Sequence, residues 1–117
     1  MGIAQTHGAA GESLAAAYLT LIGWDILARN TQLGGVEVDV VALDGRTRVL
    51  IEVKYRARTD YGGAALAVDR AKRERLRRAA GALLSNGGGP VRIDVLALEL
   101  DGEGLTLRHF RGAVADA

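Results

Sequence analysis

Two alternating runs joined by a short turn constrain the fold of this chain more than any other feature. The stretch Gly34–Arg58 contains both runs, and Asp44–Thr47 joins them. Alternation of apolar and polar residues with period two is typical of a half-buried strand, and an Asp-Gly pair favours a tight turn. The pattern therefore predicts an antiparallel hairpin, with Val36, Val38 and Val40 on one face of its first strand.

The length of the turn decides which charged side chains meet across this hairpin. A turn of two or four residues places Asp39, Glu52 and Lys54 on the same face, whereas a turn of three residues breaks that alignment. Residues directly opposed across such a pair lie about 5 Å apart, and diagonal ones lie roughly 7–8 Å apart. Two carboxylates and an ammonium group are therefore expected to converge on one small volume.

Composition bounds the class of protein. The chain has 117 residues, of which 49% are hydrophobic and 25% charged, and this composition predicts one globular domain spanning residues 1–117. It has no cysteine, which removes disulfides and thiolate chemistry. No run of 18 apolar residues and no signal peptide is visible, so we expect a cytoplasmic protein without a membrane span.

The remaining segments predict an α/β fold with the element order α-β-β-β-α-β-β. The expected helices span residues 6–22 and 69–85, and the expected further strands span 24–30, 91–100 and 105–110. The long helix between the third and fourth strands allows these two strands to run parallel. We therefore expect a mixed five-stranded sheet flanked by helices. Residues 111–117 are expected to form a flexible tail.

Details of the two helices follow from their apolar spacing. The first helix is expected to begin at Thr6 as N-cap and to stop at Gly23. The predicted core stripe of this helix is Leu14, Ala17, Tyr18 and Leu21. Glycines inside this helix suggest the close approach of another backbone or a ligand. The residues of the second helix expected to face the core are Leu76, Ala79, Ala80 and Leu83.

The convergent residues of the hairpin predict a metal-dependent phosphodiesterase site. Mg²⁺ prefers oxygen ligands and takes one or two carboxylates together with water and substrate phosphate. Asp39 and Glu52 supply carboxylates, and the carbonyl of Val53 could supply a third oxygen. Lys54 would hold the attacking water or lower its pKa. Mn²⁺ is the expected substitute, and the alternative interpretation of the triplet is a solvated strand face with a cross-strand ion pair.

Other polar residues fit structural or solvent-exposed roles better than roles in the metal site. Glu37 fits a solvated rim position better than a ligand, and Asp94 fits a buried structural acid paired with an arginine. His7 and His109 stand alone in the sequence, so each fits a structural or exposed role. Tyr55 falls on the opposite face of its strand and is expected in the core.

An ordered set of short motifs carries a resemblance to a known family. The set comprises Gly11-Glu12, Tyr18-Leu19, Gly23, Arg29-Asn30, residues 37–42 (EVDVVA), residues 52–56 (EVKYR), Tyr61-Gly62-Gly63, Ala67-Val68, Lys72, Leu76 and residues 92–95 (RIDV). With these motifs the chain resembles the YraN-like family of bacterial predicted endonucleases. That family is similar to archaeal Holliday-junction resolvases within the PD-(D/E)xK nuclease superfamily. The resemblance spans roughly residues 7–110.

The resemblance implies a restriction-endonuclease-like fold and a Mg²⁺-dependent endonuclease acting on DNA, on branched or junction substrates. It implies Asp39, Glu52 and Lys54 as the catalytic core, and Glu12 as a further metal-site carboxylate; the alternative for Glu12 is an exposed acid that favours the first helical turn. It also implies a two-fold homodimer if two symmetric strands are cut, because that needs two sites, whereas nicking of a single strand would need only one. The sequence departs from the family pattern at Val38, where proline is usual, and at Val36, where glycine is usual.

Basic residues predict contact with nucleic acid. The run 70–78 contains six basic residues against one acid, and it includes Arg70, Lys72, Arg73 and Arg77. Such a run is either a solvated helix face or a surface that follows phosphates without reading sequence. Arg56 is a further candidate for a phosphate contact. The sequence leaves DNA and RNA both open, and it leaves a second hypothesis: a catalytically inert nucleic-acid-binding module on a nuclease scaffold.

Overall fold

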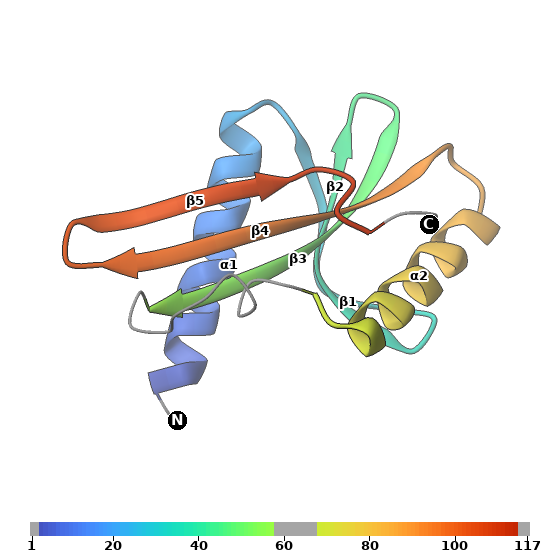
Figure 1. The fold of residues 1–117 in the computed structure, drawn as a ribbon. Helices are drawn as coiled ribbons and strands as arrows, with labels where there is room; N and C mark the ends of the chain where they lie inside the picture. Colours follow the sequence, from blue (N-terminus) through green and yellow to red (C-terminus); the bar gives the residue numbers. More distant parts are fainter. Residues whose placement is uncertain (1–2, 58–67, 115–117) are drawn as a thin grey trace.

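The structure, a computed structural model, describes residues 3–57 and 68–114, and the side chains of residues 3–9 and 57 are outside this description. Within these ranges the elements follow the order α-β-β-β-α-β-β, which confirms the predicted fold class (Figure 1). The elements are α1 (Ile3–Leu21), β1 (Asp25–Leu33), β2 (Val36–Asp44), β3 (Thr47–Ala57), α2 (Arg70–Ser85), β4 (Val91–Asp101) and β5 (Gly104–Phe110).

The five strands form one mixed sheet whose spatial order is the same as their order in the sequence. Neighbouring strands run antiparallel, except β3 and β4, which are parallel. A parallel pair needs a long crossover connection, and α2 lies in that connection. The predicted mixed sheet with flanking helices is therefore confirmed, and β3 occupies its centre.

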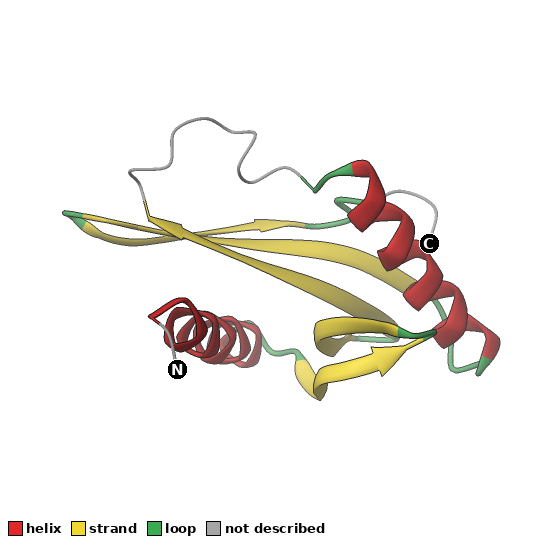
Figure 2. Cartoon of the chain, turned by 90° about the horizontal axis from the view of Figure 1, so that it is seen from below, coloured by secondary structure: helices red, strands yellow, loops and turns green. Residues whose placement is uncertain are grey.

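The two helices cover opposite faces of the sheet, and each face has its own core (Figure 2). The core on the α1 side consists of Ala15, Leu19, Trp24, Val40, Ala42, Val49, Ile51 and Leu96. The core on the α2 side consists of Val36, Val38, Val41, Leu50, Leu76, Ala79, Ala80, Ile93 and Val114. Burial of both sheet faces explains why the central strands are nearly continuous in apolar residues between their charged positions.

Helix α1 packs on the sheet with a side that shares only Tyr18 with the predicted one. The predicted stripe was Leu14, Ala17, Tyr18 and Leu21. Leu14 is 42% exposed and Leu21 is 85% exposed, whereas Gly11, Ala15 and Leu19 are buried. A Cβ atom at Gly11 would lie 3.5 Å from Cδ1 of Leu98, already in van der Waals contact. The small residues therefore face the sheet because they let the helix backbone approach it, as the helical glycines suggested.

The ends of the elements follow their capping residues. Helix α1 begins at Ile3, so the predicted N-cap at Thr6 is wrong, whereas Gly23 follows the helix with a φ of +94°, as a C-terminal stop requires. Asp69 caps α2, because its side chain accepts a 2.8 Å hydrogen bond from the amide of Lys72. The core-facing residues predicted for α2 are confirmed.

Strand β1 continues three residues past its predicted end, and the turn to β2 contains only Gly34 and Gly35. Both glycines have positive φ, +58° and +77°, which a two-residue hairpin turn requires. Residues 31–33 therefore belong to the strand that the sequence predicts to end at residue 30. A Cβ atom at Gly34 would lie 3.2 Å from Cβ of Ala82 and 3.3 Å from the carbonyl oxygen of Arg78, so this turn packs closely on α2.

Replacing Gly34 by alanine should lower the free energy of unfolding more than replacing Gly35. Both variants force a left-handed conformation on an L-residue, which costs about 1–2 kcal/mol. The methyl group at position 34 also meets α2, whereas no atom of the described residues lies within 4 Å of a Cβ atom at Gly35. Urea denaturation of the two variants measures the difference. Equal losses would show that the contact with α2 costs nothing.

A buried carboxylate at Asp94 ties the C-terminal part of the chain to the α1 side. Its oxygens accept hydrogen bonds from Arg92 (2.8 and 3.1 Å) and from the Gly112 amide (2.9 Å), and lie 2.8 Å from Nε2 of His109. The other ring nitrogen of His109 lies 2.8 Å from the hydroxyl of Tyr18 in α1. The predicted structural roles of Asp94 and His109 are confirmed.

The segment after β5 continues to pack on the fold as far as the structure describes it. The amide of Ala113 donates to the carbonyl of Ile93, and Val114 is 3% exposed. Residues 111–114 therefore differ from the flexible tail expected there, because Asp94 and the core on the α2 side bind them. Residues 115–117 and the side chain of His7 lie outside the described residues. Neither helix of the described ranges is long and apolar enough to span a membrane.

Candidate metal centre

Asp39 lies where β2 separates from β3. The last backbone pair between these strands is Val40 with Ile51, although both strands continue beyond it. At the next position the amide of Val53 donates a 2.8 Å hydrogen bond to Oδ2 of Asp39. The carboxylate of Asp39 thus takes the place of a backbone acceptor for the Val53 amide. This bond fixes the position of the carboxylate through Oδ2 and does not involve Oδ1.

The alternation of β2 is interrupted at the same residue. Val36 and Val38 belong to the core on the α2 side, whereas Val40 belongs to the core on the α1 side. The prediction that these three valines share one face is therefore wrong. Asn30, which lies between the β1 partners of Val38 and Val40, has a positive φ of 49°, so the ladder is distorted on both strands opposite Asp39.

Glu52 provides the second carboxylate, from the central strand. It is 7% exposed, and its Oε1 lies 3.4 Å from Nζ of Lys72 in α2. Its other oxygen, Oε2, is buried and has no hydrogen-bond partner among the residues that the structure describes. A buried carboxylate oxygen without a partner is costly, and a bound cation would satisfy it.

Electrostatics show that these carboxylates influence each other. Burial raises the pKa of Asp39; the hydrogen bond from the Val53 amide opposes the rise, and the negative charge of Glu12 adds to it. Burial also raises the pKa of Glu52, and the charge of Asp39 raises it further, whereas the charge of Lys72 opposes the rise. A site that disfavours two negative charges in this way favours the entry of a cation.

The remaining predicted site residues surround this pair. Lys54 is half-buried on β3, and its charge lowers the pKa of both Glu52 and Asp69. Glu12 is half-buried on α1, and its negative charge raises the pKa of Asp39. Glu37 is exposed, as expected for a rim position. The structure therefore brings Asp39, Glu52 and Lys54 together and adds Glu12 at their edge.

The donor set fits a hard divalent cation that keeps part of its water shell. Within the described ranges no group of three or more His, Cys, Asp or Glu side chains is close enough to hold a metal ion. Two carboxylates, Asp39 and Glu52, with one buried unsatisfied oxygen, match Mg²⁺ or Mn²⁺ completed by water and substrate phosphate. The contact that the structure shows for Val53 is made by its amide, and ligation by its carbonyl stays a prediction.

The basic residues predicted to contact nucleic acid differ in their surroundings. Arg70 and Arg73 are exposed on α2, and Arg77 on the same helix pairs with Glu74 at 3.2 Å. Arg56 forms a 3.1 Å salt bridge with the buried Glu99 on β4, so it is tied to the sheet. The motif Tyr61-Gly62-Gly63 lies outside the described residues.

Sequence reasoning did not foresee that Lys72 would join the carboxylates. A signal was present, because Lys72 precedes the buried Leu76 by four residues and therefore shares its face of α2. The sequence predicts Lys72 as part of the basic run that contacts phosphates. In the structure it points its charge at Glu52 instead.

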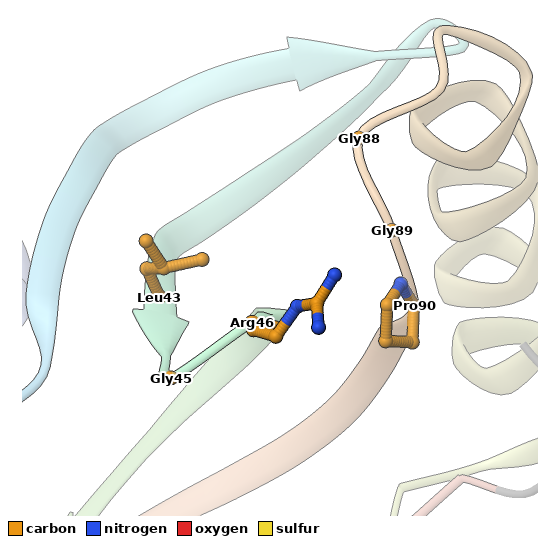
Figure 3. A pocket seen from close by; sticks show the side chains of 6 residues that line it. All are labelled: Leu43, Gly45, Arg46, Gly88, Gly89 and Pro90. Carbon is orange, nitrogen blue, oxygen red and sulfur yellow. The ribbon is translucent and has the colours of Figure 1, made fainter.

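A pocket of about 620 Å³ lies elsewhere, between the β2–β3 turn and the loop after α2 (Figure 3). The residues lining it are Leu43, Gly45, Arg46, Gly88, Gly89 and Pro90. None of these carries a carboxylate, so this pocket lacks the donors of the candidate metal centre.

Comparison with known proteins identifies the family. The model of the family described as "Uncharacterised protein family UPF0102" matches residues 11–98. The chain belongs to family UPF0102. A UPF0102 protein of Mycolicibacterium vanbaalenii is 47% identical over 96 residues, which cover 80% of this chain and 79% of the relative. One of Stutzerimonas stutzeri is 38% identical over 117 residues (97% and 98%), and one of Mycobacterium tuberculosis is 43% identical over 114 residues (90% and 89%).

The resemblance to the YraN-like family is thereby confirmed, because UPF0102 is that family. The UPF0102 match begins just before Glu12 and ends at Leu98 in β4, two residues before the last β4 residue that pairs with β3. It includes Asp39, Glu52 and Lys54, so the candidate metal centre lies wholly inside the part of the chain that defines membership of UPF0102. The family description assigns no activity.

Proposed function

We propose that this protein is a Mg²⁺-dependent endonuclease that hydrolyses phosphodiester bonds in DNA. One observation carries the proposal: Asp39 and Glu52, two carboxylates with raised pKa values, lie together beside Lys54 at the point where two central strands separate. Hard cations bind such carboxylates and phosphate oxygens at once. The family resemblance to predicted endonucleases supports the same reaction.

Each residue of the centre has a distinct role in this proposal. Asp39 would bind the cation through the oxygen that does not accept from the amide of Val53, Glu52 would bind it through Oε2, and Glu12 would assist from α1. A divalent cation held there neutralises charge on the phosphate and lowers the pKa of a water molecule. Lys54 holds the attacking water in line with phosphorus and contributes positive charge near the transition state.

The substrate is proposed to lie along α2. The exposed Arg70 and Arg73 would contact phosphates without reading sequence, and Arg77 would join them if it leaves Glu74. Arg56 would contribute its charge from its place beside Glu99. Branched or junction DNA is the proposed substrate, and two copies of the chain would supply the two centres needed to cut two strands.

One observation favours a second function, an inert nucleic-acid-binding module. The described part of the chain brings only two carboxylates to the centre, and Lys72 already neutralises one of them. Such a module would bind DNA in a salt-dependent way, and neither metal nor Asp39→Ala would change that binding. It would not cleave any substrate.

Incubation of the protein with four-way junction, flap and single-stranded DNA, and with matched RNA, tests the proposal. We expect cleavage of DNA in Mg²⁺ or Mn²⁺ and none in EDTA. Calorimetry should show Mn²⁺ binding that Asp39→Ala abolishes. DNA binding without metal binding or cleavage would instead support the inert module.

A further inference from the structure

Lys72 is the residue whose position the proposed function does not explain. It is the third residue of α2, and the bond from its amide to the capping carboxylate of Asp69 fixes its backbone. Its side chain is only 26% exposed, and its Nζ lies 3.4 Å from Oε1 of Glu52. A phosphate-binding lysine would be expected to reach into solvent, whereas this one reaches a buried carboxylate.

The charge of Lys72 acts on both carboxylates of the centre. It lowers the pKa of Glu52, through its charge and its hydrogen bond, and it lowers the pKa of Asp39. Each effect opposes the rise that burial causes. Lys72 thus has the electrostatic effect that a bound cation would have on the same two groups.

We propose that Lys72 is the internal counter-ion of the metal centre, and that its ammonium group must leave Glu52 before a divalent cation can bind there. This inference rests on the proposed function. An ammonium and a divalent cation repel each other and compete for the same carboxylate. Lys72 therefore lowers the affinity for metal, and the metal, on binding, frees the ammonium group.

The displaced ammonium group of Lys72 would be able to take part in binding the substrate. A lysine in the first turn of α2 stands beside the exposed Arg70 and Arg73, where a phosphate would lie in the proposed complex. A displaced Lys72 can bind that phosphate, so metal and DNA would each strengthen the binding of the other. If the metal increases the affinity for DNA, then DNA must increase the affinity for the metal by the same factor.

Substitution of Lys72 by methionine tests the inference without relying on catalysis. Methionine keeps most of the length of the side chain and removes its charge. Calorimetric titration with Mn²⁺ at pH 8.5, where protons compete least with the metal, should show binding about threefold to tenfold tighter than in the wild type. The matched control is Arg75→Met, which removes one positive charge from an exposed position on the same helix. It should leave the Mn²⁺ affinity unchanged.

Thermal unfolding provides a second readout. Without metal, Lys72→Met should melt at a lower temperature than the wild type, because Glu52 loses its counter-ion. Saturating Mn²⁺ should raise the melting temperature of Lys72→Met more than that of the wild type. Circular dichroism before the titration establishes that the variant is folded.

The outcomes separate this inference from the function on which it rests. Wild-type binding of Mn²⁺ with equal or weaker binding by Lys72→Met overturns the counter-ion role and leaves the nuclease proposal standing. An equal gain in affinity by Arg75→Met also overturns it, because general charge would then explain the effect. Absence of Mn²⁺ binding in the wild type and in both variants overturns the metal centre and this inference together.

Discussion

Replacing Asp39 by asparagine should lower the rate of metal-dependent DNA cleavage by about a hundredfold to a thousandfold. Asparagine has the same shape and can still accept the hydrogen bond from the amide of Val53, so the separation of β2 from β3 should persist. The negative charge that would bind the cation is lost. Single-turnover cleavage of junction DNA in Mg²⁺ measures the effect.

The matched control is Glu37→Gln, two residues away on the same strand. Glu37 is exposed and has a small influence on the pKa of Asp39, so this variant should cleave at nearly the wild-type rate. If Asp39→Asn cleaves as fast as the wild type, the reaction takes place at another site. If Glu37→Gln loses as much activity as Asp39→Asn, the loss comes from removing a negative charge in this region, and not from removing a ligand of the metal ion.

The largest expected effect on stability comes from Asp94→Ala. We expect the free energy of unfolding to fall by about 3 kcal/mol, because Arg92, His109 and the amide of Gly112 all lose their acceptor. Urea denaturation at neutral pH measures the loss. The control is Asp44→Ala, which removes the other carboxylate partner of Arg92. Its side chain is 32% exposed, so it should cost no more than about 1 kcal/mol.

The contribution of Asp94 should also depend on pH in one direction. Burial alone would raise its pKa, but the hydrogen bonds from Arg92, Gly112 and His109 outweigh burial and hold the pKa below the ordinary value of 3.8. Stability from such a group is fully present above the ordinary pKa and is lost as the pH falls through the lower folded-state pKa. The difference between wild type and Asp94→Ala should therefore be constant near neutral pH and shrink only below about pH 4. A difference that shrinks already between pH 7 and pH 5 would contradict this assignment.

The sequence was sufficient where one local signal dominated. The Asp-Gly turn and the alternation of β3 determined the register that brings Glu52 and Lys54 to one face with Asp39 nearby. In α2 the charged side chains between residues 70 and 78 leave Leu76 as the one large apolar residue of the first half, so the stripe that contains it has to face the sheet, and this predicted stripe is the buried one. In both cases one pattern left a single way to bury apolar surface.

The prediction failed where tertiary packing chose between two acceptable patterns. Helix α1 has apolar residues on most of its circumference, so periodicity alone could not select the side with Gly11 and Ala15 that approaches the sheet most closely. The interruption at Asp39 has no local signal either, because it arises where β2 leaves β3. Lys72 reaches Glu52 only because the crossover brings α2 over β3, which is a long-range event.

The two strands that carry the carboxylates differ in how they are paired within the sheet. Glu52 stands on a strand bonded to β4 along ten consecutive pairs, from Arg48 with Val91 to Ala57 with Leu100, so its backbone cannot shift without breaking that ladder. Asp39 stands just beyond the last pair of β2 with β3, Val40 with Ile51, and there accepts a hydrogen bond from the amide of Val53 in β3. The distance between the two carboxylates therefore depends on α2, because Val36, Val38 and the turn at Gly34 of the β1–β2 hairpin pack on the α2 side of the sheet.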